Sequence, residues 1–218
     1  MTKTKGSDLL MLVSLAALWA GSFFFIKLAV GDVGPILLAF ARTSIAGLLL
    51  LFILKVRAEN VEFVKNFVHY FALGGMNAAL PFVLIGLSEQ KLDVAVASTL
   101  NAMTPLFSLV IAALMGMERM TGMKLVALGI GVTGVYFAAG GTLSDSPPIS
   151  LYHVLASLLA AGSYAAAGVY SKKFSMHMQP LSLACGQQLG AALLLLPFAV
   201  LTDFKPVWST SAIAATLA

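Results

Sequence analysis

Charged residues are scarce in this 218-residue sequence. Asp, Glu, Lys and Arg together make up 10% of it, whereas hydrophobic residues make up 60%. The mean hydropathy is +0.96, far above that of a soluble domain, because a soluble domain has to place many polar and charged side chains on its surface. The shortage of charge therefore excludes a water-soluble enzyme or binding domain and indicates a membrane protein.

Several other features are missing, and each absence removes a class of function. Cys185 is the one cysteine, so no disulfide can form within the chain. The sequence contains neither a GxxxxGKS/T phosphate-binding motif nor the HExxH zinc motif, and His69, His153 and His177 fall near the ends of apolar runs. We therefore predict no enzyme activity, metal or cofactor. No Asp or Glu falls deep in an apolar run, so a buried carboxylate for proton coupling is not expected.

The apolar residues are gathered into long runs. A bilayer core about 30 Å thick takes about 20 helical residues to cross, and the runs reach or approach that length. A membrane-spanning strand would be shorter and would alternate polar with apolar residues, so we expect helices. The predicted spans are residues 9–30, 35–54, 67–87, 94–115, 123–139, 151–171 and 180–201, with an eighth that begins near residue 209.

Lys and Arg are distributed unevenly among the connections between these runs. If the N-terminus is cytoplasmic, nine of them lie in cytoplasmic segments and two, Lys91 and Lys205, lie on the other side. Cytoplasmic loops are enriched in basic residues, so we expect the N-terminus in the cytoplasm. The net charge of +4 then follows from membrane topology and requires no nucleic-acid partner.

Two pairs of segments recur in the same order. The sequence AGSFFF (20–25) recurs as AGSYAA (161–166), and PILLAFARTSIAGLL (35–49) recurs as PLSLACGQQLGAALL (180–194), with six of fifteen positions identical in the second pair. We infer a duplicated unit of five helices. Because five is odd, the second copy is inverted relative to the first, which is the architecture of many secondary transporters.

The repeat divides the chain into a first unit at 9–140, an external linker at 141–149 and the start of a second unit at 150–218. The second unit contains two helices and the beginning of a third. A span that stops halfway leaves backbone carbonyls without partners in lipid. We therefore expect a C-terminally truncated chain that holds about seven and a half of ten transmembrane helices.

Five stretches also resemble a known family. They are WAGSFFFIKLAV, PILLAFARTSIAGLLLL, LPFVLIGLS, STLNAMTPLFSLVIAAL and MERMTGMKLVALGIGVTGVYF, and in this order they resemble the signatures of the EamA family in the drug/metabolite transporter (DMT) superfamily. The resemblance covers 9–140 and weakens over 150–218. It implies an all-α polytopic protein with two inverted five-helix EamA units, both termini cytoplasmic, in a bacterial inner membrane. It also implies export or uptake of small metabolites without indicating which.

Two asparagines stand four residues before prolines in neighbouring predicted spans. Pro81 and Pro105 bend their helices and remove the hydrogen bonds to the carbonyls of Asn77 and Asn101. By helical rise, both turns lie near the middle of the bilayer, where an unpaired polar group is costly. We expect the two turns to share a polar pocket. The alternative is that neighbouring hydroxyl groups or water satisfy the freed carbonyls.

Two basic residues fall inside predicted spans. Arg42 lies about seven residues, or roughly 10 Å, from one end of the second span, and its counterpart in the second repeat is Gln187. Lys27 lies in the last turn of the first span. Each side chain either extends to the membrane surface or points inward and favours a substrate with a carboxylate. Trp19 and Ser22 fall on the same face of the first predicted helix. This face either forms a wall of the pocket or packs against a neighbouring helix.

These patterns favour a secondary transporter, and we expect an exporter of small metabolites such as amino acids or drug-like compounds. The alternatives are a nucleotide-sugar or other organic-anion carrier and a membrane scaffold that transports nothing. Small residues at Ala127 and Gly131 predict a packing seam against the other repeat or in a homodimer. The candidate substrate-binding residues are Asn77, Asn101, Thr104, Ser98, Arg42, Trp19 and Ser22. The expected partners are the lipid bilayer and a small-molecule substrate.

Overall fold

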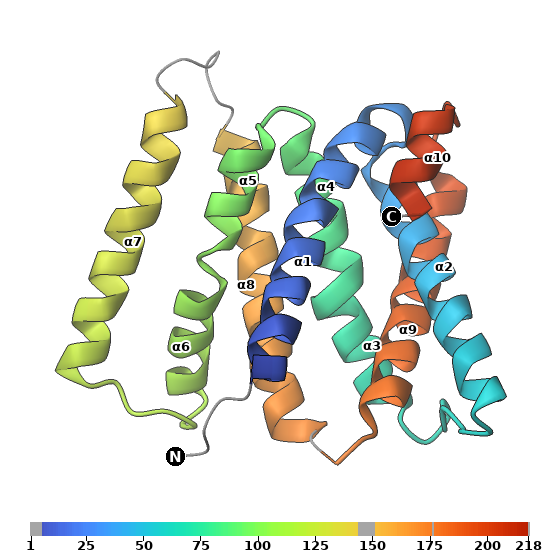
Figure 1. Cartoon of the computed structure of the whole chain (residues 1–218), viewed down its shortest axis with the longest axis horizontal. Coiled ribbons are helices and arrows are strands. Elements are labelled where there is room, and N and C mark those ends of the chain that lie inside the picture. The colour runs from blue at the N-terminus through green and yellow to red at the C-terminus, as the bar shows by residue number, and fades with distance from the viewer. Residues whose placement is uncertain (1–5, 144–150, 176, 218) are drawn as a thin grey trace.

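The computed structural model describes residues 6–143, 151–175 and 177–217. Within these residues the helices run side by side as a bundle, with α7 at one edge and α2, α9 and α10 at the other (Figure 1). The helices are α1 Gly6–Val33, α2 Pro35–Val56, α3 Phe67–Gly74, the π-helical turn η1 Gly75–Ala79, α4 Leu80–Glu89, α5 Val94–Asn101, α6 Thr104–Leu114, α7 Gly122–Leu143, α8 Leu151–Phe174, α9 Pro180–Leu201 and α10 Thr210–Leu217.

Six helical stretches among the described residues are long and apolar enough to cross a membrane, judged by length and composition. They are Asp8–Val33, Pro35–Val56, Phe67–Glu89, Val94–Leu114, Leu151–Phe174 and Pro180–Leu201. A shorter apolar helical stretch covers Gly122–Phe137, where we expected a further span. The predicted all-α polytopic fold is confirmed, and the segment expected to begin near residue 209 is helical as α10.

Two of the expected spans are interrupted at their prolines. In the first, η1 separates α3 from α4, and the Leu80 amide bonds to the Gly75 carbonyl five residues back instead of four. That shift leaves the Met76 carbonyl free, and Ser163 Oγ on α8 donates to it at 2.7 Å. The second span breaks into α5 and α6 just before Pro105. Proline therefore divides each span into two shorter helices, as its missing amide predicts.

Glycine allows α3 and α9 to approach backbone to backbone. A Cβ atom built on Gly74 would lie 2.6 Å from the backbone nitrogen of Ala191 and the backbone oxygen of Gln187. A Cβ on Gly190 would lie 2.7 Å from the Tyr70 carbonyl oxygen. Helices pack this closely in membranes when small residues line the contact, because dispersion replaces the hydrophobic effect there. The α3–α9 contact holds the first part of the chain against the segment that repeats α2.

Large apolar side chains cover much of the outside of the bundle. The first half of α1 exposes residues such as Leu10 (68%) and Leu18 (74%), and α7 exposes Tyr136 (73%). The buried core uses smaller side chains, including Ala29, Ala160 and other alanines. An apolar exterior around a small-residue core is the reverse of a soluble protein and suits a lipid environment.

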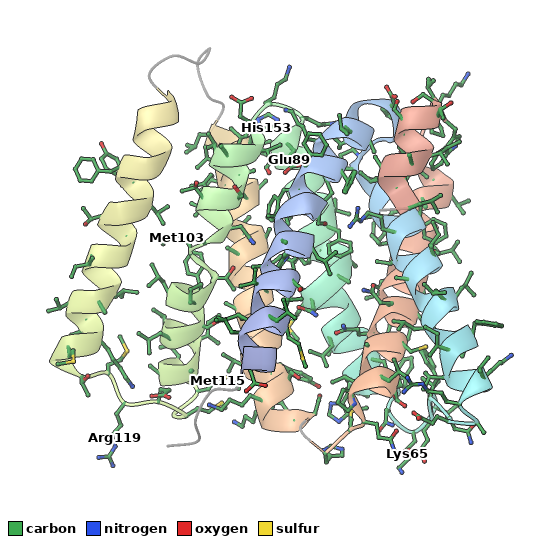
Figure 2. The ribbon with its side chains drawn as sticks, viewed as in Figure 1. Lys65, Glu89, Met103, Met115, Arg119 and His153 are labelled. Atoms are coloured by element: carbon green, nitrogen blue, oxygen red, sulfur yellow. The ribbon has the colours of Figure 1, made fainter. Side chains whose placement is uncertain are left out.

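Basic residues gather at one end of the bundle. Lys65 and Arg119 lie at the same end, whereas Glu89 and His153 lie at the opposite end (Figure 2). Lys172 and Lys173 occupy the last turn of α8, which also reaches the Lys65 end (Figure 1). We call these the basic end and the far end. This distribution is the one from which we predicted a cytoplasmic N-terminus, and the orientation stays a prediction.

Candidate functional site

Arg42 points into the bundle instead of extending to the surface. Its Nη2 donates to Ser22 Oγ on α1 at 2.8 Å, and its guanidinium lies 5.8 Å from the ring centroid of Phe82 on α4, a distance typical of cation–π contacts. Arg42 Nη1 is buried and has no hydrogen-bond partner among the described residues. A buried, unpaired guanidinium nitrogen in an apolar bundle is costly, so this position suits water or an anionic ligand group.

An aromatic pair stands beside this arginine. The rings of Trp19 on α1 and Tyr164 on α8 meet edge to face, with centroids 6.1 Å apart and an interplanar angle of 87°. Tyr164 also lies near Arg42. Trp19 and Ser22 therefore lie on the α1 face that Arg42 and Tyr164 approach, and the structure brings these predicted site residues together.

A second polar contact joins η1 to α9. Asn77 Nδ2 in η1 donates to Gln187 Oε1 on α9 at 3.2 Å. Ser163 precedes Tyr164 and bonds to Met76, the neighbour of Asn77, so this contact adjoins the aromatic pair. We use the name central polar cluster for the five polar residues that make these two hydrogen bonds or belong to the aromatic pair. They are Ser22, Arg42, Asn77, Tyr164 and Gln187.

The residues around Pro105 form a separate network. Thr104 Oγ1 donates to the Asn101 carbonyl at 2.7 Å, and Ser98 Oγ donates to the Ala95 carbonyl at 3.1 Å. The hydroxyl of the neighbouring threonine thus replaces the hydrogen bond that proline removes. Asn101 is 8% exposed, and its Oδ1 is buried without a partner in the described part of the chain. No hydrogen bond in the described part of the chain joins Asn101 to Asn77, so the shared pocket stays a prediction.

Lys27 is held by backbone carbonyls near the far end. Its Nζ donates to the carbonyl oxygens of Glu89 at 2.6 Å and Leu92 at 2.8 Å. It therefore ties α1 to the end of α4, with no carboxylate within ion-pair distance in the described residues. These two bonds use most of the donor capacity of the ammonium group.

Glu89 is buried although it lies at the end of a span instead of deep within one. The predicted span ended at residue 87, but α4 continues through Glu89, whose side chain is 0% exposed. Both carboxyl oxygens are buried and lack hydrogen-bond partners within the described segments. The sequence SEQKLD is polar enough to read as a loop, so hydropathy alone could not locate this residue.

Two further residues of this region were missed, although the repeat contained a signal for them. Ser163 and Tyr164 align with Ser22 and Phe23 in the AGSFFF and AGSYAA pair. Ser22 bonds to Arg42, and its counterpart Ser163 bonds to the carbonyl freed by η1. The repeat alignment pairs these two serines, although it does not indicate which partner each of them binds.

Two other expectations concern a dimer seam and a metal. In the predicted seam, a Cβ on Gly131 would lie 2.9 Å from Leu106 on α6, whereas Gly129 faces open space. Part of this face packs within the chain, and the homodimer stays a prediction.

In the residues that the structure describes, no three His, Cys, Asp or Glu side chains gather in a metal-binding arrangement.

Apolar spans around a buried arginine, amides and aromatic rings define a multi-pass membrane protein with a polar interior. The model of the EamA-like transporter family matches residues 7–140, more than half of the chain. The protein therefore belongs to the EamA-like transporter family, whose activity is membrane transport.

Curated relatives agree with this assignment. The chain is 27% identical over 189 residues to an uncharacterized transporter of Archaeoglobus fulgidus, covering 87% of this chain and 66% of the relative. It is 23% identical to the uncharacterized transporter YoaV of Bacillus subtilis, covering 91% and 68%. It is 25% identical to the uncharacterized inner membrane transporter YedA of Escherichia coli K12, covering 80% and 55%. The chain thus spans about half to two thirds of these relatives' lengths. No solved structure matches.

Proposed function

We propose that this protein is a secondary transporter that moves small metabolites with a carboxylate group, such as amino acids, out of the cell across the inner membrane. The inner membrane is the location in the name of the YedA relative. The basic end faces the cytoplasm in this proposal, because positive residues accumulate on that side.

The observation that carries the proposal is the unpaired Nη1 of Arg42. Nη2 is already bonded to Ser22, and the guanidinium group lies near the ring of Phe82. These contacts orient the group and leave Nη1 as a free donor. A substrate carboxylate would satisfy that donor with a charge-assisted bond. Trp19 and Tyr164 would pack against the apolar part of the substrate.

A nucleotide-sugar carrier is the nearest alternative within transporters. It would have to neutralise two phosphates and would require several free cations near the substrate. The central polar cluster contains one cation, Arg42, and the ammonium of Lys27 is bonded to two backbone carbonyls. These contacts favour a single carboxylate over a diphosphate.

The test is an efflux screen in cells that express the protein. Amino acids, their toxic analogues and drug-like compounds are supplied, and export is compared between the wild type and Arg42→Gln. Loss of one charge-assisted bond, worth about 1.5–3 kcal/mol, should reduce export of carboxylate compounds about tenfold or more and affect neutral compounds less.

The matched control is Arg57→Gln, since Arg57 is an exposed residue just beyond α2. It should export normally. Equal losses for charged and neutral compounds in Arg42→Gln would assign Arg42 a structural role. Export of nothing by the wild type would favour the membrane scaffold.

A further inference from the structure

Glu89 is fully buried and does not belong to the central polar cluster. Its side chain is 0% exposed, and neither carboxyl oxygen accepts a hydrogen bond from a described residue. An ionised carboxylate in that setting loses its hydration without any donor to replace it. A neutral carboxylic acid costs far less to bury, so the surroundings favour the form that has bound a proton.

Two cations lie near enough to oppose this preference. Lys27 on α1 and Arg42 on α2 both attract the carboxylate, but neither forms an ion pair with it. The ammonium of Lys27 is directed at the backbone carbonyls of Glu89 and Leu92, and Arg42 is directed at Ser22. Their attraction to the carboxylate is therefore partial.

The remaining elements that pack against α4 add few titratable groups. From α8 come Tyr164 and His153, and the latter lies at the far end, as Glu89 does (Figure 2). Neither η1 nor α5 contributes an acidic or basic side chain. Lys91 and Asp93, in the connection to α5, are exposed to solvent.

An open cavity lies beside Glu89. A cavity of about 530 Å³ at the far end is lined by Lys27, Val30, Gly31, Glu89, Gln90 and Lys91. Glu89 is among the residues that line this open depression, although its side chain is covered.

From this geometry we propose that Glu89 is a proton-binding site that exchanges protons with the far side of the membrane. Three observations support this proposal: the carboxyl group is buried, no described residue donates a hydrogen bond to it, and Glu89 adjoins the cavity. The use of the proton to drive transport rests on the proposed function. In that case, proton release from Glu89 leaves a carboxylate that attracts Lys27 and Arg42 and so changes the charge around the central polar cluster.

The test is infrared spectroscopy of the purified protein in lipid nanodiscs during a titration from neutral to strongly alkaline pH. A neutral carboxylic acid has a carbonyl band distinct from that of a carboxylate. The wild type should show this band at neutral pH and lose it at alkaline pH. Glu89→Gln should lack it throughout, whereas Glu62→Gln, which removes an exposed carboxylate, should retain it.

Labelling with ¹³C-glutamate provides a second assignment that needs no substitution, in case Glu89→Gln does not fold. The chain has four glutamates, Glu59, Glu62, Glu89 and Glu118, and Glu89 is the buried one. The band should shift with the label. A band that persists in Glu89→Gln or ignores the label, or a wild type with no band at neutral pH, would overturn the proposal. None of these results depends on transport.

Discussion

Replacing Gly74 with alanine tests whether the backbone contact between α3 and α9 holds the bundle together. The new Cβ would lie 2.6 Å from two α9 backbone atoms, whereas ordinary contact begins at 3.4 Å, so the helices would have to separate by about 0.8 Å. Backbone atoms cannot rotate away as a flexible side chain can. Overpacking of this kind costs about 1–3 kcal/mol, and a backbone clash belongs at the upper end.

Alanine also has a higher helix propensity than glycine, by about 1 kcal/mol, which would hide part of this cost. The matched variant is Gly168→Ala on α8, where a Cβ meets nothing within 4 Å. Both variants gain the same propensity, so the difference between them isolates the clash. We expect Gly74→Ala to be less stable than Gly168→Ala by about 1–3 kcal/mol.

The free energy of unfolding can be measured by titrating the purified proteins with sodium dodecyl sulfate in mixed micelles, followed by circular dichroism. Equal unfolding midpoints for Gly74→Ala and Gly168→Ala would refute the close α3–α9 packing. A loss in Gly74→Ala that also appears in Gly168→Ala would show that glycine is needed for a reason other than contact.

Two further predictions concern the carbonyls freed at the prolines. Ser163→Ala removes the donor to Met76 and should lower the free energy of unfolding by about 1–3 kcal/mol in the same titration, because a buried acceptor is left unpaired. Thr104→Val, which keeps the shape, should lower it by a similar amount through the Asn101 carbonyl. Ser98→Ala, whose target carbonyl lies within a regular helix, should change it by less than about 0.5 kcal/mol. Similar small effects at all three positions would show that water replaces these hydroxyls.

Hydropathy was enough to locate the spans, because about 20 apolar residues in succession have few alternatives to a membrane helix. It could not place the ends of helices whose last turn is polar. Glu89 shows this limit, since its burial depends on α1 and Lys27 packing over the end of α4. The π-helical turn is also a tertiary effect, because Ser163 from α8 stabilises the carbonyl that the turn leaves free.

The candidate site was partly accessible from sequence. Arg42 and Asn77 stand out because polar groups are rare at that depth, and the structure turns both inward. Their partners could not be chosen from sequence, since any of several serines or amides has the right chemistry. Gln187 is the counterpart of Arg42 in the repeat alignment, which says nothing of its contacts. Its bond to Asn77 depends on the packing between helices.

The central claim is that the central polar cluster is a water-accessible substrate site, and cysteine labelling tests it most directly. The wild type serves as the negative control, because Cys185 is its one cysteine and is fully buried. In membrane vesicles, Asn77→Cys should react with a charged, water-soluble thiol reagent, and a compound exported in the screen should slow the reaction. Leu48→Cys, at an exposed apolar position on α2, should react slowly and without protection. An Asn77→Cys thiol that reacts no faster than Leu48→Cys would contradict the claim.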